Sequence, residues 1–346
     1  MVREKKKATI TDIATAAGVS KATVSRYING KEHLISDKAK ERIKTVIELL
    51  DYRPDQAARS LKTKRSRQIG VLLSNIETPF AASVIVGVST FLHARGYEPL
   101  FVDCHNDARK EAEAIHSFLD KMVEGLIVNT TFIDNPPLIR ASCEGCPVVL
   151  IDRFVNNHNF NIVTVEQRQT TYRLVEHLKQ VGYTRPVVFA LPVEKNTTRL
   201  RKLDAFIQAV NEIYGYDPSE DVYIIRDSEG NTAEEQLEKL MASAKPEDKI
   251  AIMGINSETT VLTYKAIIAR NLSMPDQIGL CGPEEWVMNW STLLKPAITT
   301  VCVPTKDLGF QAAQLLLELI DAPNAEPRTI ELPCKLIARE STGLKQ

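Results

Sequence analysis

The chain has 346 residues, of which 44% are hydrophobic and 25% charged, which is enough for about two or three compact domains with buried cores. No apolar run reaches the ~18 residues that a transmembrane helix needs, and the charged start is unlike a signal peptide, so we expect a soluble, cytoplasmic protein without membrane contact. The six scattered cysteines form no disulfide framework, and the C-x-x-C at Cys143 and Cys146 lacks partners for zinc. We therefore expect reduced thiols, no metal and no cofactor.

The charge of the chain is unevenly distributed. Residues 1–67 hold 17 basic and 8 acidic side chains, a net charge of +9, whereas the remainder holds 26 basic and 36 acidic side chains, a net charge of -10. A basic front segment suits nucleic-acid binding, because each neutralised phosphate releases a counterion, and an acidic body resists wrapping onto DNA. We expect such binding to weaken steeply with salt.

Residues 9–29 predict two short helices joined by a tight turn. Thr9 is a helix cap with Asp12 at the third helical position, Gly18 can end the helix in the left-handed conformation, and Ser20 can cap the next helix. The apolar face of the first helix is formed by Ile10, Ile13, Ala14 and Ala17. This arrangement predicts a helix-turn-helix, the motif that places its second helix in the DNA major groove.

The second helix, from Lys21 to about Asn29, turns Val24 and Ile28 inward. The residues left on its outer surface are Lys21, Ala22, Ser25, Arg26 and Asn29. Arginine can bond two guanine acceptors, alanine can touch a thymine methyl, and serine, threonine and asparagine can reach phosphates. The alternative is a solvated polar face on an ordinary helical hairpin, which needs neither the short turn nor these small polar side chains.

A third helix is predicted from Asp37 to about Leu50, with Ser36 as its cap. Its inward side chains are Ala39, Ile43, Val46, Ile47 and Leu50. The following linker contains a short helical stretch, Gln56 to Lys62, which alone cannot offset the cost of helix nucleation.

Leu61 is the exposed apolar residue of this linker, and basic residues surround it. An apolar wedge among positive charges can enter the minor groove and bend the duplex. A flexible tether with one harmless leucine is the alternative.

From Gln68 onward, short apolar runs alternate with helical patterns, and the rhythm repeats after about residue 160. Buried parallel strands with crossover helices produce this pattern, which predicts two doubly wound subdomains. Such sheets serve enzymes and binding proteins alike. The sequence lacks the phosphate-loop, zinc-protease and nucleophile-elbow motifs, so no catalytic residue is predicted.

The blocks ATITDIATAAGVSKATVSRYING and RPDQAARSLKTKRSRQIGVLL resemble the LacI/GalR family of bacterial transcriptional regulators, and the resemblance extends over essentially the whole chain. It implies an N-terminal all-α helix-turn-helix headpiece with a hinge helix, and an α/β core like the periplasmic binding proteins, made of two doubly wound parallel-sheet subdomains. The implied domains are a headpiece at 1–53, a hinge at 54–66, an N-terminal core subdomain at 67–165 and 300–329, and a C-terminal core subdomain at 166–299 and 330–346. Crossings between the subdomains are expected near 164–167, 299–304 and 328–331.

By the same resemblance, the second helix reads bases through Lys21, Ala22 and Arg26, and Leu61 intercalates. Phosphate contacts are implied for Thr23, Ser25, Asn29 and Tyr52, and the set of candidate DNA contacts is completed by Thr9, Ser20 and Arg59. The family binds palindromic operators as a homodimer, whose two hinge helices fold together on DNA. The C-terminal tail lacks the heptads of a tetramerising coiled coil, which favours a dimer.

The resemblance also implies a small effector in the cleft between the subdomains. Residues that follow strands are its candidate contacts: Phe80, Asp152, Arg153, Asn256, Glu284 and Trp286. The effector-binding arginine of the family best matches Arg201, although Lys202 is possible. The chain also departs from the family at Asn256-Ser257 and at Gly282-Pro283-Glu284-Glu285, so the ligand of a better-known member cannot be transferred.

Carboxylates, amides and tryptophan suit a sugar, and two cations favour a sugar acid. The alternatives are that Arg153 and Arg201 pair with Asp152 or Glu166, and that Trp286 and Trp290 only pack. The predicted function is a sequence-specific repressor controlled by a sugar or sugar acid. A sugar-metabolising enzyme with a DNA-binding head is the alternative, whereas a transport-type sugar binder does not explain the basic headpiece.

Overall fold

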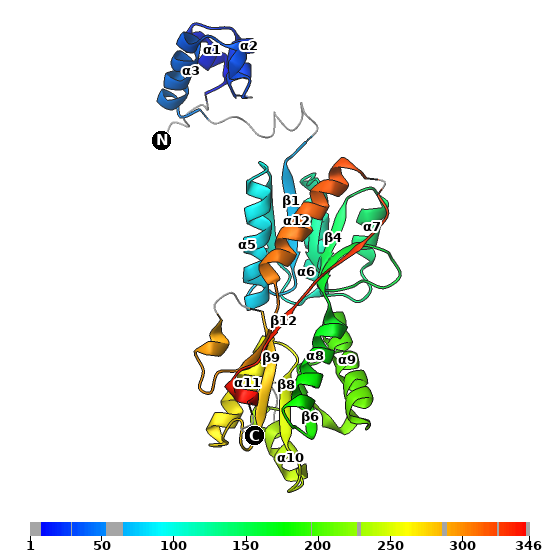
Figure 1. Cartoon of the computed structure of the whole chain (residues 1–346). Helices are drawn as coiled ribbons and strands as arrows, with labels where there is room; N and C mark the ends of the chain where they lie inside the picture. Colours follow the sequence, from blue (N-terminus) through cyan, green and yellow to red (C-terminus); the bar gives the residue numbers. More distant parts are fainter. Residues whose placement is uncertain are drawn as a thin grey trace, which may run out of the picture. The chain divides into compact units, whose positions relative to one another are not determined.

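The computed structural model describes residues 8–28, 30–52, 65–194, 196–226, 230–285, 289–323 and 325–343. The chain forms two compact units, Met1–Ser66 and Arg67–Gln346 (Figure 1). Most of the predicted hinge at 54–66 lies outside the described residues.

The first unit is a small helical domain. Its elements are α1 (Ile10–Ala17), α2 (Lys21–Ile28), the 3-10 turn η1 (Glu32–Leu34) and α3 (Asp37–Leu49). They enclose a core of Ile13, Ala14, Ala17, Val24, Ile43 and Tyr52.

The predicted turn chemistry of this unit is confirmed. The Thr9 hydroxyl oxygen accepts from the Asp12 backbone N–H at 3.3 Å, and the Asp12 carboxylate accepts from the Thr9 N–H at 2.8 Å. Gly18 ends α1 at φ +63°, and the Ser20 hydroxyl accepts from the Thr23 N–H at 3.1 Å. These caps stabilise helices that are too short to persist alone.

Three details of the helical prediction are wrong. Ile10 and Leu50 were expected inward, yet each is 37% exposed, because the small core is already filled by their helix neighbours. Ser36 precedes α3 but makes no side-chain cap hydrogen bond.

The second unit contains two six-stranded sheets, one in each subdomain. The strand order of the first sheet is β11-β5-β4-β3-β1-β2, and all its pairs are parallel. Its strands are β1 (Gln68–Leu73), β2 (Glu98–Asp103), β3 (Leu126–Asn129), β4 (Val148–Ile151), β5 (Asn161–Val165) and β11 (Thr329–Leu332). Its helices are α5 (Pro79–His93), α6 (Ala108–Asp120), α7 (Pro136–Cys143) and α12 (Thr305–Asp321).

The second sheet has the order β12-β10-β9-β8-β6-β7, and only β12 runs antiparallel to its neighbour. Its strands are β6 (Arg185–Ala190), β7 (Val222–Ile224), β8 (Ile250–Gly254), β9 (Gly279–Glu284), β10 (Thr299–Cys302) and β12 (Lys335–Ile337). Its helices are α8 (Gln167–Gln180), α9 (Thr197–Tyr214), α10 (Ala233–Ser243) and α11 (Ser257–Ala269), with short turns η2 (Ser219–Asp221), η3 (Trp290–Thr292) and η4 (Glu340–Thr342).

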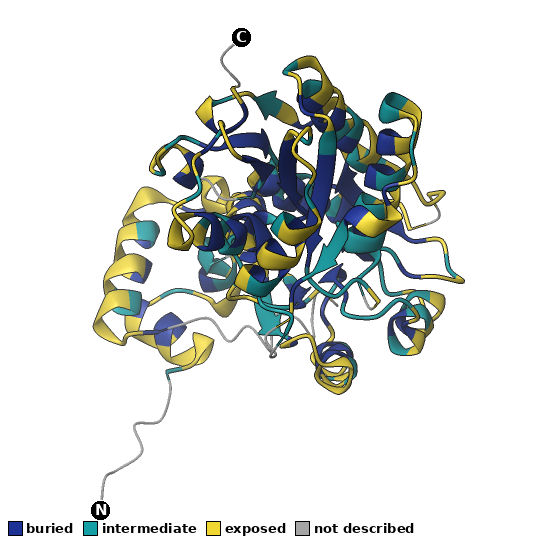
Figure 2. Cartoon of the chain, turned by 90° about the horizontal axis from the view of Figure 1, so that it is seen from below, coloured by how far each residue is buried: buried dark blue, intermediate teal, exposed yellow. Residues whose placement is uncertain are grey.

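Helices cover both faces of each sheet, so the central strands are buried on both sides, whereas the edge strands β2, β7, β11 and β12 are partly exposed (Figure 2). Along β1, Val71 packs on the face of α5 and α12, whereas Leu72 packs on the face of α6. Alternation of this kind explains why the strands read as continuous apolar runs rather than as half-polar strands. The predicted fold class, an N-terminal helix-turn-helix region followed in the chain by two parallel-sheet subdomains, is confirmed.

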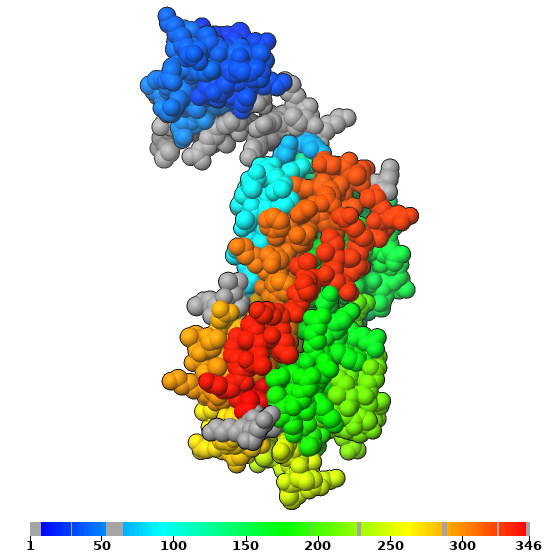
Figure 3. All heavy atoms as spheres, in the orientation of Figure 1, coloured from blue at the N-terminus to red at the C-terminus, as the bar shows by residue number. Residues whose placement is uncertain are grey.

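Helices α5 and α12 lie side by side, seen as cyan and orange atoms in Figure 3. Glycine on each helix permits the approach: a Cβ added at Gly87 would collide with the Lys306 carbonyl, and one at Gly309 with the Val84 carbonyl. Backbone therefore packs directly on backbone at this crossing.

Three connections join the two subdomains. They lie between β5 and α8, between β10 and α12, and between β11 and β12. The expected boundaries at 299/300 and 329/330 differ from this arrangement, since β10 belongs to the second sheet as far as Cys302 and β11 to the first as far as Leu332. Strands β10 and β11 pair with their neighbours up to the crossing between the subdomains. The end of strand pairing leaves no signal in the hydropathy of the sequence, so the expected boundaries fall too early.

In the part of the chain that the structure describes, no helix combines the length and the apolar composition needed to cross a bilayer.

Candidate ligand and nucleic-acid sites

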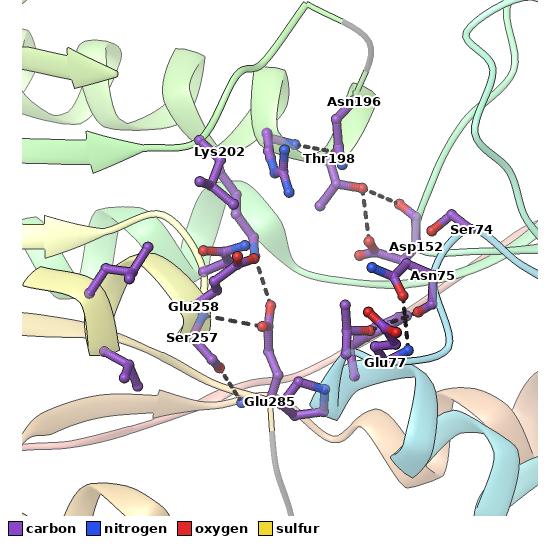
Figure 4. Close-up of a pocket in the computed structure, with 18 of the residues that line it drawn as sticks. Ser74, Asn75, Glu77, Asp152, Asn196, Thr198, Lys202, Ser257, Glu258 and Glu285 are labelled. Atoms are coloured by element: carbon purple, nitrogen blue, oxygen red, sulfur yellow. Dashed lines mark hydrogen bonds and ion pairs between the residues drawn. The ribbon is translucent and has the colours of Figure 1, made fainter. Parts of the chain in front are cut away.

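A cavity of about 940 Å³ lies between the two subdomains (Figure 4). Residues that directly follow strands form much of its wall: Ser74 after β1, Asp152 after β4, Leu191 after β6 and Glu285 after β9. Carboxyl ends of parallel strands are where open α/β sheets place their ligands. The cavity therefore has the position expected of a binding site.

Two arginines supply partly buried positive charge to this cavity. The Arg153 guanidinium donates to the Thr130 carbonyl at 2.8 Å, and that of Arg199 donates to the Pro192 carbonyl at 3.0 Å. Burial lowers the pKa of Arg153 to about 10, and the positive charge of Arg199 adds to this lowering. Among the described residues, neither guanidinium forms an ion pair with a carboxylate, so both can receive an anion.

A lysine and two carboxylates complete the charged set. Lys202 pairs with Glu285 at 3.5 Å, and Glu285 also accepts from the Ser257 backbone N–H at 3.2 Å. Asp152 accepts from the Thr198 hydroxyl at 2.9 Å, and its burial raises its pKa against the opposing effect of Lys202. The cavity wall therefore carries both cations and carboxylates.

The first turn of α9 fixes several of these side chains. Asn196 caps the helix by accepting from the Arg199 N–H at 3.0 Å. The Thr198 hydroxyl donates to Asp152, and the Thr197 hydroxyl accepts from the Phe154 N–H at 3.0 Å, so hydrogen bonds from α9 link the subdomains beside the cavity. On this helix, residues 199 and 202 share one face because they lie three positions apart.

The structure places some of the predicted effector residues in the cavity wall and others outside it. Those that line the cavity are Phe80, Asp152, Arg153 and Asn256. Trp286 lies outside the described residues, whereas Trp290 lines the cavity and is also part of the core, at 9% exposure.

Arg201 is not part of the cavity wall. Its guanidinium carbon lies 3.3 Å from the centre of the Phe154 ring, and Lys202, one residue further along the helix, faces the cavity. A step of one residue turns a helix by about 100°. The alternative pairing of Arg153 or Arg201 with Glu166 is also not seen among the described ion pairs, because Glu166 pairs with Arg173 at 3.5 Å.

Glu284 lies behind the wall rather than in it. It is 2% exposed and accepts from the Ser291 hydroxyl at 2.8 Å and the Thr300 hydroxyl at 3.0 Å, with Arg339 at 3.6 Å. Side chains alternate along a strand, so at this strand end Glu284 points into the protein and Glu285 into the cavity. The prediction of Glu284 as an effector contact is therefore wrong, and Glu285 is the carboxylate at this strand end that lines the cavity.

Sequence reasoning missed Arg199, Glu285 and the amides of Asn75 and Asn129, which also line the cavity. The spacing of Arg199 and Lys202 on one helix face was an available signal. The amides follow β1 and end β3, and position at a strand end was a signal for them as well.

The C-x-x-C motif does not contribute to a metal site in the described part of the chain. All six cysteines are free, Cys143 is exposed, and burial raises the pKa of Cys146 to about 11. The described residues contain no group of three or more metal-ligating side chains.

The outer face of α2 carries the candidate base-reading residues. Lys21, Ala22 and Arg26 are exposed, and Thr23 and Ser25 are half-buried. The Thr9 and Ser20 hydroxyls are exposed but already take part in the caps of their helices. Tyr52 is 9% exposed and packs in the core of the unit, and Asn29, Arg59 and Leu61 lie outside the described residues.

The folds and sites together define a DNA-binding regulator with a ligand cavity, and comparison with known proteins supports this class. Residues 66–340 match the family model described as periplasmic binding proteins and sugar binding domain of LacI family. Residues 9–55 match the model described as bacterial regulatory proteins, lacI family. The chain belongs to the LacI family of bacterial transcriptional regulators.

Similar curated proteins match along nearly the full length. The HTH-type transcriptional regulator KdgR of Bacillus subtilis is 33% identical over 96% of this chain and 97% of its own. The HTH-type transcriptional regulator PtxS of Pseudomonas aeruginosa is 30% identical over 96% of this chain and 95% of its own.

Solved structures share the fold at lower identity. The lac repressor dimer bound to operator and the anti-inducer ONPF has a TM-score of 0.84 at 23% identity, covering 97% of this chain and 99% of that one. The regulator CelR in complex with cellobiose has a TM-score of 0.70 at 22% identity, covering 97% and 100%.

Proposed function

We propose that this regulator is a repressor that binds a palindromic operator as a homodimer, and that a sugar or sugar acid in the cavity controls its operator affinity. The observation that carries the proposal is the cavity itself, in which Arg153, Arg199 and Lys202 lie partly buried beside amides. Lys202 pairs with Glu285, whereas Arg153 and Arg199 form no ion pair with a carboxylate among the described residues and therefore favour a carboxylate ligand. Amides favour hydroxyls. The lac repressor dimer on its operator and the CelR complex with cellobiose are precedents within the same fold.

On the DNA side, the proposal assigns base reading to Lys21, Ala22 and Arg26. These side chains are exposed on one face of a capped helix, as a helix in the major groove requires. Thr23 and Ser25 are assigned to phosphates. Leu61 is assigned to the minor groove on sequence grounds alone.

On the ligand side, Arg153 and Arg199 receive the carboxylate, and Asn75 bonds hydroxyl groups. Phe80 and Trp290 supply apolar surface for a sugar ring. The ligand shifts the balance between two conformations of the dimer that differ in operator affinity, and the protein acts in the cytoplasm without turning the ligand over.

Two coupled binding experiments test this function. Symmetric duplexes selected from bacterial genomic DNA are titrated with the full-length protein, and neutral sugars, sugar acids and sugar phosphates are screened for a rise in its melting temperature. We expect a preferred symmetric site and a stabilising sugar or sugar acid that changes the Kd for that site at least about tenfold, a typical coupling between sites. A stabilising ligand that leaves the operator Kd unchanged, or that is consumed, contradicts the proposal.

A further inference from the structure

The charged residues of the cavity divide into an exposed set and a partly buried set. Glu77, Glu258 and Lys265 are exposed, so solvent weakens their effect on a ligand in the cavity. Burial lowers the pKa of Arg199, and the charge of Glu258 still opposes this lowering. The partly buried set consists of three cations and two carboxylates, which carry a net charge of +1 when all five groups are ionised: Arg153, Arg199, Lys202, Asp152 and Glu285. A cavity with this balance is neutralised by one negative charge on its ligand.

Glu285 is held in place by contacts with Ser257 and Lys202. Its carboxylate accepts from the Ser257 N–H at 3.2 Å, and its own backbone N–H donates to the Ser257 hydroxyl at 3.1 Å. It pairs with Lys202 (Figure 4), and the side chains of Glu285 and Lys202 are 15% and 14% exposed. The Glu285 carboxylate therefore occupies Lys202, a cation that would otherwise be available to an anionic ligand.

We propose that Glu285 determines the charge selectivity of the cavity, admitting a singly charged sugar acid and rejecting doubly charged sugar phosphates. This inference rests on the proposed function and deepens it. Specificity arises here from repulsion as much as from attraction, since the second negative charge of a dianion exceeds the net charge of +1 and is repelled by the Asp152 and Glu285 carboxylates.

Coulomb energy is proportional to the ligand charge, and this gives the inference a quantitative signature. A phosphate monoester carries close to two negative charges above its second pKa of about 6. Glu285→Gln removes one carboxylate and leaves an amide oxygen to accept from Ser257. If the substitution tightens binding of a carboxylate by about tenfold, it should tighten binding of a phosphate dianion by about the square of that factor, roughly a hundredfold.

The experiment measures Kd by calorimetry at pH 8 for three probes: the best-binding hexonate or hexuronate from the screen, the 6-phosphate of the corresponding hexose, and the neutral hexose. In the wild type, the acid should bind more tightly than the phosphate. In Glu285→Gln, the ratio of phosphate to acid affinity should rise about tenfold, and neutral-sugar binding should be unchanged. A role of Glu285 in shape alone would change all three probes alike and would overturn the inference.

Two further variants sharpen the test. Glu212→Gln, on the same helix as Lys202, removes a carboxylate from an exposed ion pair with Arg168 and should leave the ratio unchanged. Lys202→Gln combined with Glu285→Gln restores the net charge of +1 and should return the ratio toward the wild-type value, even if the single variant folds poorly. A double variant that still prefers phosphate overturns the inference.

These outcomes separate the two claims. Wild-type protein that binds no sugar, sugar acid or sugar phosphate contradicts the proposed function. Wild-type protein that binds a sugar acid, but with equal or tighter binding of the phosphate, contradicts only the role of Glu285.

Discussion

At the scale of single residues, Arg153 combines burial, an incomplete set of partners and a lowered pKa. One of its donors is used by the Thr130 carbonyl, and Glu111, fully buried behind it, bonds the Thr130 and Thr131 hydroxyls and holds that loop. A guanidinium held in this way is oriented before the ligand arrives, which reduces the entropic cost of binding.

Replacing Arg153 by Gln should weaken binding of an anionic ligand by about tenfold to a hundredfold, the range for loss of a charge-assisted hydrogen bond. Calorimetric titration measures this change. The matched control is Arg201→Gln, which removes the same charge outside the cavity wall and should change the Kd less than about threefold, as for an exposed interaction. If Arg201→Gln has the larger effect, the assignment of the cavity-facing side of α9 is wrong.

Arg26 is the residue expected to read guanine, and its test is one of specificity. Arg26→Ala should cost about 1–3 kcal/mol on the preferred operator and much less on random duplex. Lys44→Ala removes an equal charge from the exposed face of α3 and should weaken both duplexes alike. If Arg26→Ala weakened binding to the operator and to random duplex by the same factor, Arg26 would contact phosphates rather than bases.

At the scale of elements, close backbone packing joins α5 and α12 within the N-terminal core subdomain. Gly87 and Gly309 leave no room for a Cβ on either helix, and Phe310 of α12 packs its ring edge-on against Phe91 at 4.8 Å between ring centres. Both glycines are visible in the sequence, but a glycine within a helical pattern does not predict which other helix packs against it.

Gly309→Ala should lower the free energy of unfolding by about 1–3 kcal/mol, because its methyl group meets the Val84 backbone and forces the two helices apart. Gly343→Ala is the control, since a Cβ there makes only ordinary contacts at 3.6 Å or more. Thermal melting of the full-length protein compares them. Equal melting temperatures for both variants would mean that the helices adjust without cost.

Features set by residues close together in the sequence were mostly predicted correctly, whereas several features set by contacts between distant residues were not. Local signals, such as the Thr9 cap and the left-handed Gly18, predicted α1 and its turn correctly. The direction of Glu284 and Glu285 depends on which strand lies next to β9 and on the distant Arg339, contacts that no local pattern encodes. The cavity position followed from strand ends, whereas its individual charged contacts required the tertiary structure.

At the scale of the whole molecule, the two compact units have different charges and different tasks. The basic unit carries the candidate DNA-contact helix, and the acidic unit carries the cavity. The central claim of the proposed function is that the two units communicate. Thermodynamic linkage makes this coupling reciprocal, so a ligand that changes operator affinity must itself bind with a different affinity when operator is present.

The most direct test is a fluorescence anisotropy titration of the preferred symmetric duplex with the full-length protein, at fixed moderate salt, with and without a saturating stabilising ligand. We predict that the ligand changes the operator Kd at least about tenfold in the wild type, a typical coupling energy, and not in Arg153→Gln at the same ligand concentration. A protein that binds symmetric and scrambled duplexes equally well, or whose operator Kd is the same with the cavity filled and empty, would contradict the account.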